Sequence, residues 1–175
     1  RMAQQLSMPA PSVIQPVYSL VNRVAEMEQL PAAQEYGMGV ISYSPLARGV
    51  LSGKYRSMED VPADSRVARA DKRILDTEWR AESLVVANAV RERAEARGWS
   101  TADFATAWVI ANKLVTSAIA GPRTFAQWKG YLQALNLTLD ADDEAFVDAL
   151  VSPGYASTHG YHDPSHRVTG RISRA

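Results

Sequence analysis

The stretch GVISYSPLARGVLSGKY, residues 39–55, decides how the rest of the chain is interpreted. It opens with a short apolar run ending at Tyr43, which is typical of a buried strand, and Ser44 and Pro45 then break the run. Two glycines, an arginine and a lysine follow. Glycine lets a backbone approach a ligand closely and basic side chains attract anions, so the stretch predicts a strand followed by an anion-binding loop.

The composition is that of one globular unit spanning residues 1–175, with 46% hydrophobic residues. Nineteen basic residues balance nineteen acidic ones, so we expect neither nucleic acid nor an anionic membrane as a partner. The absence of cysteine excludes disulfides, thiol catalysis and cysteine-based zinc sites. With no signal peptide and no apolar run of about twenty residues, the sequence favours a cytoplasmic protein.

The elements expected along the chain alternate between strand and helix, which predicts an α/β fold with a parallel sheet and right-handed crossovers. Three strands leave both sheet edges open, so we expect this unit to be half of a larger structure that begins before Arg1. The apolar residues of the helix after the third strand should face inward; they are Phe125, Trp128, Leu132 and Leu135. The expected ranges are strands at 13–15, 39–43 and within 115–123, helices within 26–37 and at 78–97, 100–113, 124–135 and 142–151, a long loop at 55–77, and an irregular C-terminal tail at 152–175.

A second loop with similar chemistry follows the third expected strand. Gly121, Arg123 and Thr124 stand directly at the start of a helix, whose first N–H groups are free to bind an anion. Either loop by itself could simply turn the chain. Ligands of α/β proteins bind at the carboxyl ends of the strands, and eight-stranded barrels often bind phosphate with the loops after the last two strands. Two such loops therefore favour a nucleotide site.

The chain resembles the C-terminal half of aldo-keto reductases, particularly of bacterial members of that family. The segments SVIQPVYSLVNR, GVISYSPLARGVLSGKY and SAIAGPRTFAQWKGYLQAL are similar, in order, to the regions of that family's sixth, seventh and eighth strands. The tail SPGYASTHGYHDPSHRVTGR also resembles bacterial members. The resemblance implies strands 6–8, with their helices, of a TIM (β/α)8 barrel, and NADP(H) as the cofactor.

The resemblance also implies a role for individual residues toward that cofactor. Gln15 would hydrogen-bond the nicotinamide carboxamide, and Tyr43 would stack on the nicotinamide ring. Lys54 and the more weakly indicated Arg66 would add positive charge, Lys54 at the pyrophosphate and Arg66 from the long loop over the cofactor. The pyrophosphate would be lined by Ser44, Pro45, Leu46, Ala47 and Arg48.

The helix after the third strand would hold the adenosine end. Gly121, Arg123 and Gln127 would surround the 2′-phosphate, which predicts NADPH over NADH. Gln127 stands where many members have arginine. Gly130 and Tyr131 stand where the family often has Glu-Asn, so Tyr131 would lie beside an adenine that lacks its usual polar contacts.

The family reduces carbonyls with an Asp, Tyr, Lys and His set carried by its first half, in which the tyrosine is the general acid. None of those motif positions is present here, and we assign no catalytic residue. The remaining tyrosines lie outside that motif's context; they are Tyr18, Tyr36, Tyr55, Tyr155 and Tyr161. We therefore expect a cofactor site that is inactive without a partner.

The histidine-rich tail segment HGYHDPSH raises the question of a metal site. His159, His162 and His166, with Asp163 between them, are loosely spaced in a segment rich in glycine and proline. We expect no metal there, and expect the tail to pack near the substrate mouth, as the resemblance implies.

Three functional hypotheses remain open. The chain could belong to an NADPH-dependent reductase of small aldehydes or ketones, completed by a missing N-terminal half. It could be a non-catalytic cofactor-binding or regulatory subunit resembling potassium-channel β subunits. It could also be a free-standing half-barrel that closes its sheet with a second copy.

Overall fold

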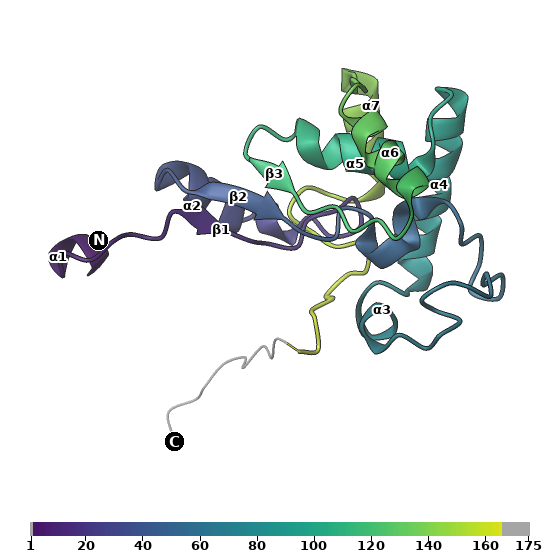
Figure 1. The fold of residues 1–175 in the computed structure, drawn as a ribbon, viewed down its shortest axis with the longest axis horizontal. Helices are drawn as coiled ribbons and strands as arrows, with labels where there is room; N and C mark the ends of the chain where they lie inside the picture. The colour runs from purple at the N-terminus through teal and green to yellow at the C-terminus, as the bar shows by residue number, and fades with distance from the viewer. Residues whose placement is uncertain (1, 166–175) are drawn as a thin grey trace.

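The computed structural model describes residues 2–165 of the chain. At its centre lies a parallel three-stranded sheet in the order β1-β2-β3, formed by Val13–Ile14, Gly39–Ser42 and Ser117–Ala118 (Figure 1). Val13 pairs with Gly39, and Ile41 pairs with Ser117. The α/β class and the parallel sheet predicted from the sequence are confirmed.

Helices make up most of the remaining regular structure. Each 3₁₀ helix, η1 and η2, lies in a connection between longer elements. The bounds are α1 Met2–Gln5, η1 Val24–Glu26, α2 Gln29–Glu35, η2 Ala47–Ser52, α3 Lys72–Thr77, α4 Ala81–Ala96, α5 Thr101–Ala111, α6 Phe125–Ala134 and α7 Ala141–Leu150. Among residues 2–165, no helix combines the length and apolar character needed to cross a lipid bilayer.

Side-chain caps fix where the later helices begin. The Ser100 hydroxyl accepts a hydrogen bond from the Asp103 backbone N–H at 3.1 Å and starts α5, as the sequence predicts. Thr124 caps α6 in the same way, and Asp140 with Asp143 forms a capping box at α7. These caps fix the first residues of α5, α6 and α7.

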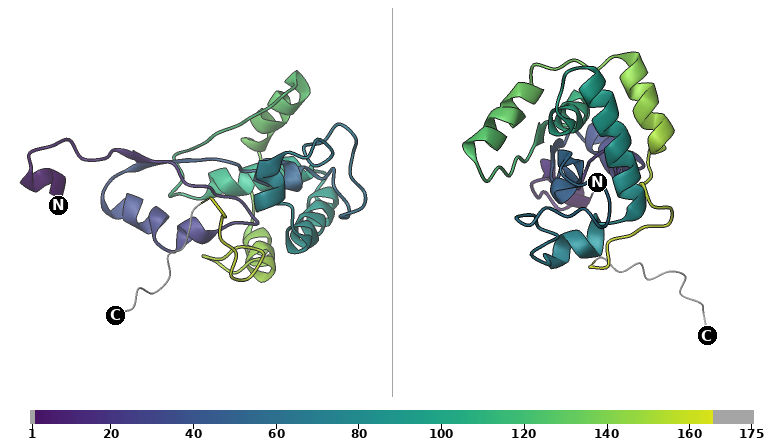
Figure 2. Two further views of the ribbon diagram at one scale, coloured as in Figure 1. Left: turned by 90° about the horizontal axis from the view of Figure 1, so that it is seen from below. Right: turned by 90° about the vertical axis from the view of Figure 1, so that its right-hand side faces the viewer.

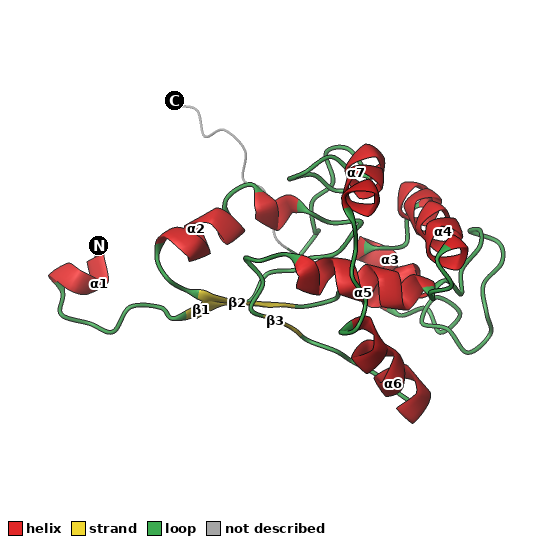
Figure 3. Ribbon diagram, turned by 90° about the horizontal axis from the view of Figure 1, so that it is seen from above, coloured by secondary structure: helices red, strands yellow, loops and turns green. Residues whose placement is uncertain are grey.

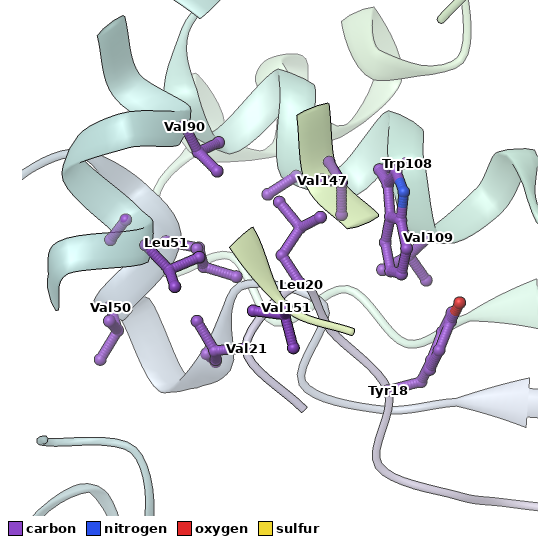
Figure 4. Close-up of a cluster of buried hydrophobic side chains, with 14 of the residues drawn as sticks. Tyr18, Leu20, Val21, Val50, Leu51, Val90, Trp108, Val109, Val147 and Val151 are labelled. Atoms are coloured by element: carbon purple, nitrogen blue, oxygen red, sulfur yellow. The ribbon is translucent and has the colours of Figure 1, made fainter. Parts of the chain in front are cut away.

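The hydrophobic core lies among the helices and the segment after β1. Leu20 and Val21, from that segment, pack with Val90 of α4 and Val109 of α5 (Figure 4). Val50 and Leu51 of η2 are fully buried in the same cluster. The loop that leaves β2 is therefore anchored in the core, which fixes its backbone at the end of the sheet.

The prediction of a loop over residues 55–77 is wrong in its last part, because α3 forms there. The Asp71 carboxylate accepts hydrogen bonds from the backbone N–H groups of Arg73 and Ile74, and it caps the helix. Ile74 is fully buried. One cap and one anchoring side chain are too weak a pattern to reveal a helix of this length in the sequence.

The inward orientation expected for the apolar side chains of α6 is also wrong. Phe125 is 71% exposed and Leu135 64% exposed, while Trp128 and Leu132 are each more than two-fifths exposed. Helix α6 contacts α5 but stands out from the other helices (Figures 2 and 3). Its apolar stripe is therefore uncovered in this chain, because the apolar spacing indicated the stripe without indicating what would cover it.

The other helix bounds shift by a few residues from those expected. Helix α4 begins at Ala81 rather than residue 78, because Arg80 adopts an extended backbone, and the helix expected within 26–37 is divided into η1 and α2. Residues 152–165 contain no helix or strand, and the rest of the expected irregular tail lies outside the described residues.

Candidate cofactor-binding site

A cleft of about 700 Å³ opens where the loops after β2 and β3 meet the helices α5 and α6. Both loops belong to neighbouring parallel strands, so their carboxyl ends reach the same edge of the sheet. The lining residues are Tyr43, Ser44, Pro45, Leu46, Arg48, Gly49, Ser52, Lys54, Arg66, Ser100, Ala102, Asp103, Thr106, Ile119, Gly121, Arg123, Ala126, Gln127, Gly130 and Tyr131.

The loop after β2 forms one wall of the cleft, and its backbone turns tightly. Ser44, Ala47 and Arg48 all have positive φ angles, between 47° and 59°, and Gly49 has a φ of 105°. Non-glycine residues in this region cost of order 1–3 kcal/mol each and persist only where the surroundings hold them. The buried Val50 and Leu51 of η2 supply that anchor, so the loop is held rigidly against the cleft.

Four cationic side chains line the cleft, and all four were predicted from the sequence. Arg48 donates through Nε to the Thr77 hydroxyl at 3.2 Å, and Lys54 Nζ lies 5.0 Å from the centre of the Tyr55 ring. Arg66 pairs with the Asp71 carboxylate at 3.1 Å. With Arg123 as the fourth cation and Asp103 as the one carboxylate among the lining residues, the cleft suits an anionic ligand.

The turn before α6 is organised by Gln127 and Thr124. The Gln127 side-chain oxygen accepts a hydrogen bond from the Arg123 backbone N–H at 2.7 Å, and its own backbone N–H donates to the Thr124 hydroxyl at 3.2 Å. Gln127 therefore shapes the turn and keeps its amide NH₂ group as a donor. Together with the start of α6, this turn offers the donors and positive charge that bind a phosphate.

Two tyrosines also line the cleft. Tyr43 follows β2, where its backbone N–H donates to the Pro16 carbonyl oxygen at 3.0 Å. Tyr131 lies on α6, and burial raises the pKa of its phenol while the Gly121 backbone opposes that shift. Such rings can pack against the flat faces of a bound heterocycle.

The structure brings most of the predicted cofactor residues together. All of them line the cleft except Gln15, which is exposed beyond β1, and Ala47, which is fully buried beneath the loop. Their proposed contacts with a cofactor stay predictions. The sequence did not indicate that α5 forms a wall, with Ser100, Asp103 and Thr106, because the first two of these residues were interpreted only as a helix start.

The C-terminal tail is fastened to α3 and to the start of α4. Arg73 Nη2 lies 2.7 Å from Asp163 Oδ2, and the Arg80 guanidinium lies 3.7 Å from the centre of the Tyr161 ring. The hydrogen bond with Asp163 raises the pKa of Arg73, and Tyr43 adds a smaller electrostatic contribution of the same sign. The tail is thus tied to α3 through Arg73 and to the start of α4 through Arg80.

The tail histidines do not form a recognisable metal site in the described part of the chain. His159 and His162 are exposed, and Asp163 is engaged by Arg73. No three side chains of the metal-binding types gather anywhere within residues 2–165. His166 lies outside the described residues.

The tyrosines set aside by the sequence do not line the cleft. Tyr18 donates to Glu26 at 2.6 Å within the core, and burial raises the pKa of its phenol well above the ordinary value. Tyr55 is also buried, while Tyr36 and Tyr155 are exposed and Tyr161 packs on Arg80.

Comparison with known protein families identifies the family of the chain. The family model described as "Aldo/keto reductase family" matches residues 1–152. The chain belongs to the aldo/keto reductase family. The prediction made from the loop strings is confirmed, and the aldo/keto reductase family implies a TIM barrel.

Individual relatives differ in what their names say. The uncharacterised oxidoreductase YrpG of Bacillus subtilis is 35% identical over 82% of this chain and 42% of its own length. An L-glyceraldehyde 3-phosphate reductase of Escherichia coli is 35% identical over 80% of this chain and 41% of its own. A probable voltage-gated potassium channel subunit beta of Oryza sativa is 34% identical over 91% of this chain and 49% of its own. The chain thus spans about two-fifths to half the length of these aldo/keto reductase relatives.

Proposed function

We propose that the chain supplies the cofactor site of an NADPH-dependent aldo-keto reductase that reduces small aldehydes or ketones to alcohols. The supporting observation is the cleft of about 700 Å³, which lies beside the loops that follow two neighbouring parallel strands. Four cationic side chains line this cleft. A dinucleotide phosphate is a long anion with a flat ring at each end. Cations and two tyrosine rings in one cleft provide for both features.

In this proposal NADPH supplies a hydride when it is bound, and the chain binds and orients it. Tyr43 packs beside the nicotinamide ring, and Gln15 contacts its carboxamide. Arg48 and Lys54 neutralise the pyrophosphate. Arg123, at the start of α6, binds the 2′-phosphate. The remaining contacts come from Ser44, Pro45, Leu46, Arg66, Gly121, Gln127 and Tyr131, which enclose the cofactor along the cleft, while Ala47 supports the loop from beneath.

The general acid of the reaction is proposed to come from outside this chain. We infer that the catalytic motif positions of the family lie outside this sequence, and the exposed side chains of α6 leave a surface open to a partner. We propose that the N-terminal half of an aldo-keto reductase barrel, or a second copy of this chain, covers that surface in the cytoplasm. Without that partner the chain is expected to bind NADPH without reducing a carbonyl.

A non-catalytic role is the second candidate. The relative from Oryza sativa, named as a probable potassium channel subunit beta, matches a larger share of this chain than the two named oxidoreductases do. In that case the same cleft would bind NADPH and the protein would act by regulating a partner. Carbonyl reduction by the completed protein distinguishes the two candidates.

The experiment that tests the proposal is titration of NADPH and NADH into the purified chain and its Arg123→Ala variant. We expect saturable binding that favours NADPH. The variant should bind NADPH more weakly by about 1–3 kcal/mol, or roughly 5- to 150-fold. Its affinity for NADH should change far less, because only NADPH carries the 2′-phosphate.

Lys129→Ala is the matched control for that titration. Lys129 is an exposed cation on α6 that does not line the cleft, and its Nζ lies 5.0 Å from the centre of the Phe125 ring. It should leave both affinities unchanged. Equal losses of NADPH and NADH in Arg123→Ala would contradict the assignment of Arg123 to the 2′-phosphate, and the absence of binding would contradict the proposed function.

A further inference from the structure

The cleft holds one anionic side chain among its cations. Asp103 projects from the first turn of α5, is partly buried, and lines the same space as Arg48, Lys54 and Arg123. Its backbone N–H donates to the Ser100 hydroxyl at 3.1 Å, but its carboxylate has no hydrogen bond or ion pair with another residue in the range 2–165. An ionised carboxylate in a cleft accepts hydrogen bonds and donates none.

Gly130 on α6 lies next to that carboxylate. A Cβ atom at Gly130 would lie 3.5 Å from Asp103 Oδ1, at van der Waals contact. Both Gly130 and the next residue, Tyr131, line the cleft, so this part of it combines an open acceptor and an aromatic ring.

The position of this acceptor along α6 separates it from the phosphate-binding turn. Gly130 follows the cap residue Thr124 by six residues, which corresponds to about 9 Å along a helix. That separation is comparable to the length of an adenosine group. A phosphate bound at the start of α6 would thus leave its purine ring near Gly130, Tyr131 and Asp103.

We propose that Asp103 recognises the exocyclic amine of the adenine ring and makes the cleft selective for adenine over its deaminated counterpart, hypoxanthine. This inference rests on the proposed function, since it takes NADPH as the ligand. The amine of adenine donates hydrogen bonds, which the carboxylate accepts. Hypoxanthine has a carbonyl oxygen at the same position, and its lone pairs repel the carboxylate.

The Asp103 side chain also has a structural role that the experiment must separate from recognition. A carboxylate in the first turn of a helix stabilises that helix through its dipole. Asp142 occupies the first turn of α7, is exposed, and does not line the cleft. Asp142→Ala therefore removes a comparable helix-stabilising charge without touching the cleft, which makes it the matched control for Asp103→Ala.

The test is titration of NADPH and of the hypoxanthine analogue of NADPH into the chain and its variants. We expect the wild-type chain to prefer NADPH by about tenfold, the change in affinity that one charge-assisted hydrogen bond can produce. Asp103→Ala should bring the ratio of affinities close to one, and Asp142→Ala should leave it near ten. Asp103→Asn, which keeps the size of the side chain and can donate as well as accept, should also lose the preference.

The outcomes separate this inference from the function on which it rests. If the wild-type chain binds both dinucleotides equally, Asp103 does not recognise the amine, while the proposed NADPH site stands. If the preference survives in Asp103→Ala and Asp103→Asn, another group recognises the base and the inference is wrong. If neither dinucleotide binds the wild-type chain, both the inference and the proposed function are wrong.

Discussion

Gly53 and Gly98 share a backbone conformation but have very different surroundings. Their φ angles are 78° and 72°, in the left-handed region that favours glycine. A Cβ atom at Gly53 would lie 2.6 Å from Thr101 Oγ1, whereas a Cβ atom at Gly98 would meet nothing within 4 Å. Gly53 therefore permits the close approach of the β2 loop to the start of α5, on which the wall of the cleft depends.

Alanine at these two glycines should separate backbone strain from crowding. Gly98→Ala should lower the free energy of unfolding by about 1–2 kcal/mol, because only the left-handed conformation is penalised. Gly53→Ala should lower the free energy of unfolding by about 1–3 kcal/mol more than Gly98→Ala does, because the loop and Thr101 must also move apart. Urea unfolding of the two variants measures both values, and equal losses would show that the contact with Thr101 does not constrain the loop.

Single residues show what local sequence can and cannot predict about the site. Arg48 and Lys54 were predicted because they stand in one continuous string after a strand, and both line the cleft. Asp103 was missed because a carboxylate three residues after a serine is already explained by the start of a helix. Its place in the cleft is next to Gly130, which lies 27 residues later in the chain, and no local pattern connects the two.

Among the elements, α3 and the tail form a contact that responds to pH and salt. Arg73 Nη2 and Nη1 lie 2.7 and 3.2 Å from the two carboxylate oxygens of Asp163, and Nη1 also donates to the Ser165 hydroxyl at 2.7 Å. The hydrogen bond from Arg73 holds the pKa of Asp163 well below its ordinary value. Both side chains are partly exposed, so the pair contributes at most about 1 kcal/mol to global stability.

Arg73→Ala should release the tail while leaving the fold intact. We expect faster amide hydrogen exchange in residues 157–165 and little change in the melting temperature. Arg69→Ala is the control, because Arg69 lies in the loop before α3 and its side chain donates to the Asp64 backbone oxygen at 2.8 Å. Unchanged exchange in Arg73→Ala would show that the other contacts of the tail, such as those of Arg80 with Tyr161 and Thr158, hold it without Arg73.

The lowered pKa of Asp163 fixes the direction of the pH dependence. Because the carboxylate has a lower pKa in the folded chain, its contribution is fully present above the ordinary value of 3.8 and is lost as the pH falls through the folded value. The protection of the tail amides in the wild-type chain, measured against the intrinsic exchange rate at each pH, should therefore stay constant from neutral pH to about 4 and fall only in stronger acid. High salt should weaken the contact at any pH, since the pair is partly exposed.

Helices and strands were predictable to the extent that one element carried its own signal. The start of α5 was predicted because Ser100 and Asp103 form a local pattern, and β2 because an apolar run precedes Ser44 and Pro45. Helix α3 was missed because Asp71 is a single cap in a polar segment. The burial of Ile74 that completes the helix is a tertiary contact, which the sequence pattern does not contain.

On the scale of the whole molecule, α6 carries a stripe of exposed apolar side chains. The side chains of this stripe, Phe125, Trp128, Leu132 and Leu135, are between 43% and 71% exposed. Val13, in the outer strand β1, is 49% exposed, and Ile119, directly after the outer strand β3, is 42% exposed. The sequence predicted the parallel sheet, because alternation of strand and helix is a property of the chain itself. It could not predict which surfaces would be covered, since the spacing of apolar residues along α6 carries no information about what packs against them.

The exposed stripe of α6 should drive association of the purified chain. Contiguous apolar surface and open strand edges favour contact with another molecule. We expect the mass measured by sedimentation to rise with protein concentration, and we expect Trp128→Lys with Leu132→Lys to keep the chain monomeric without unfolding it, because both side chains already lie on the surface. Val85→Lys is the control, since Val85 is 67% exposed on α4, away from the stripe. A wild-type chain that stays monomeric at all concentrations would contradict the second-copy arrangement and leave the N-terminal half of a barrel as the proposed partner, whereas association that persists in the double variant would place the contact elsewhere.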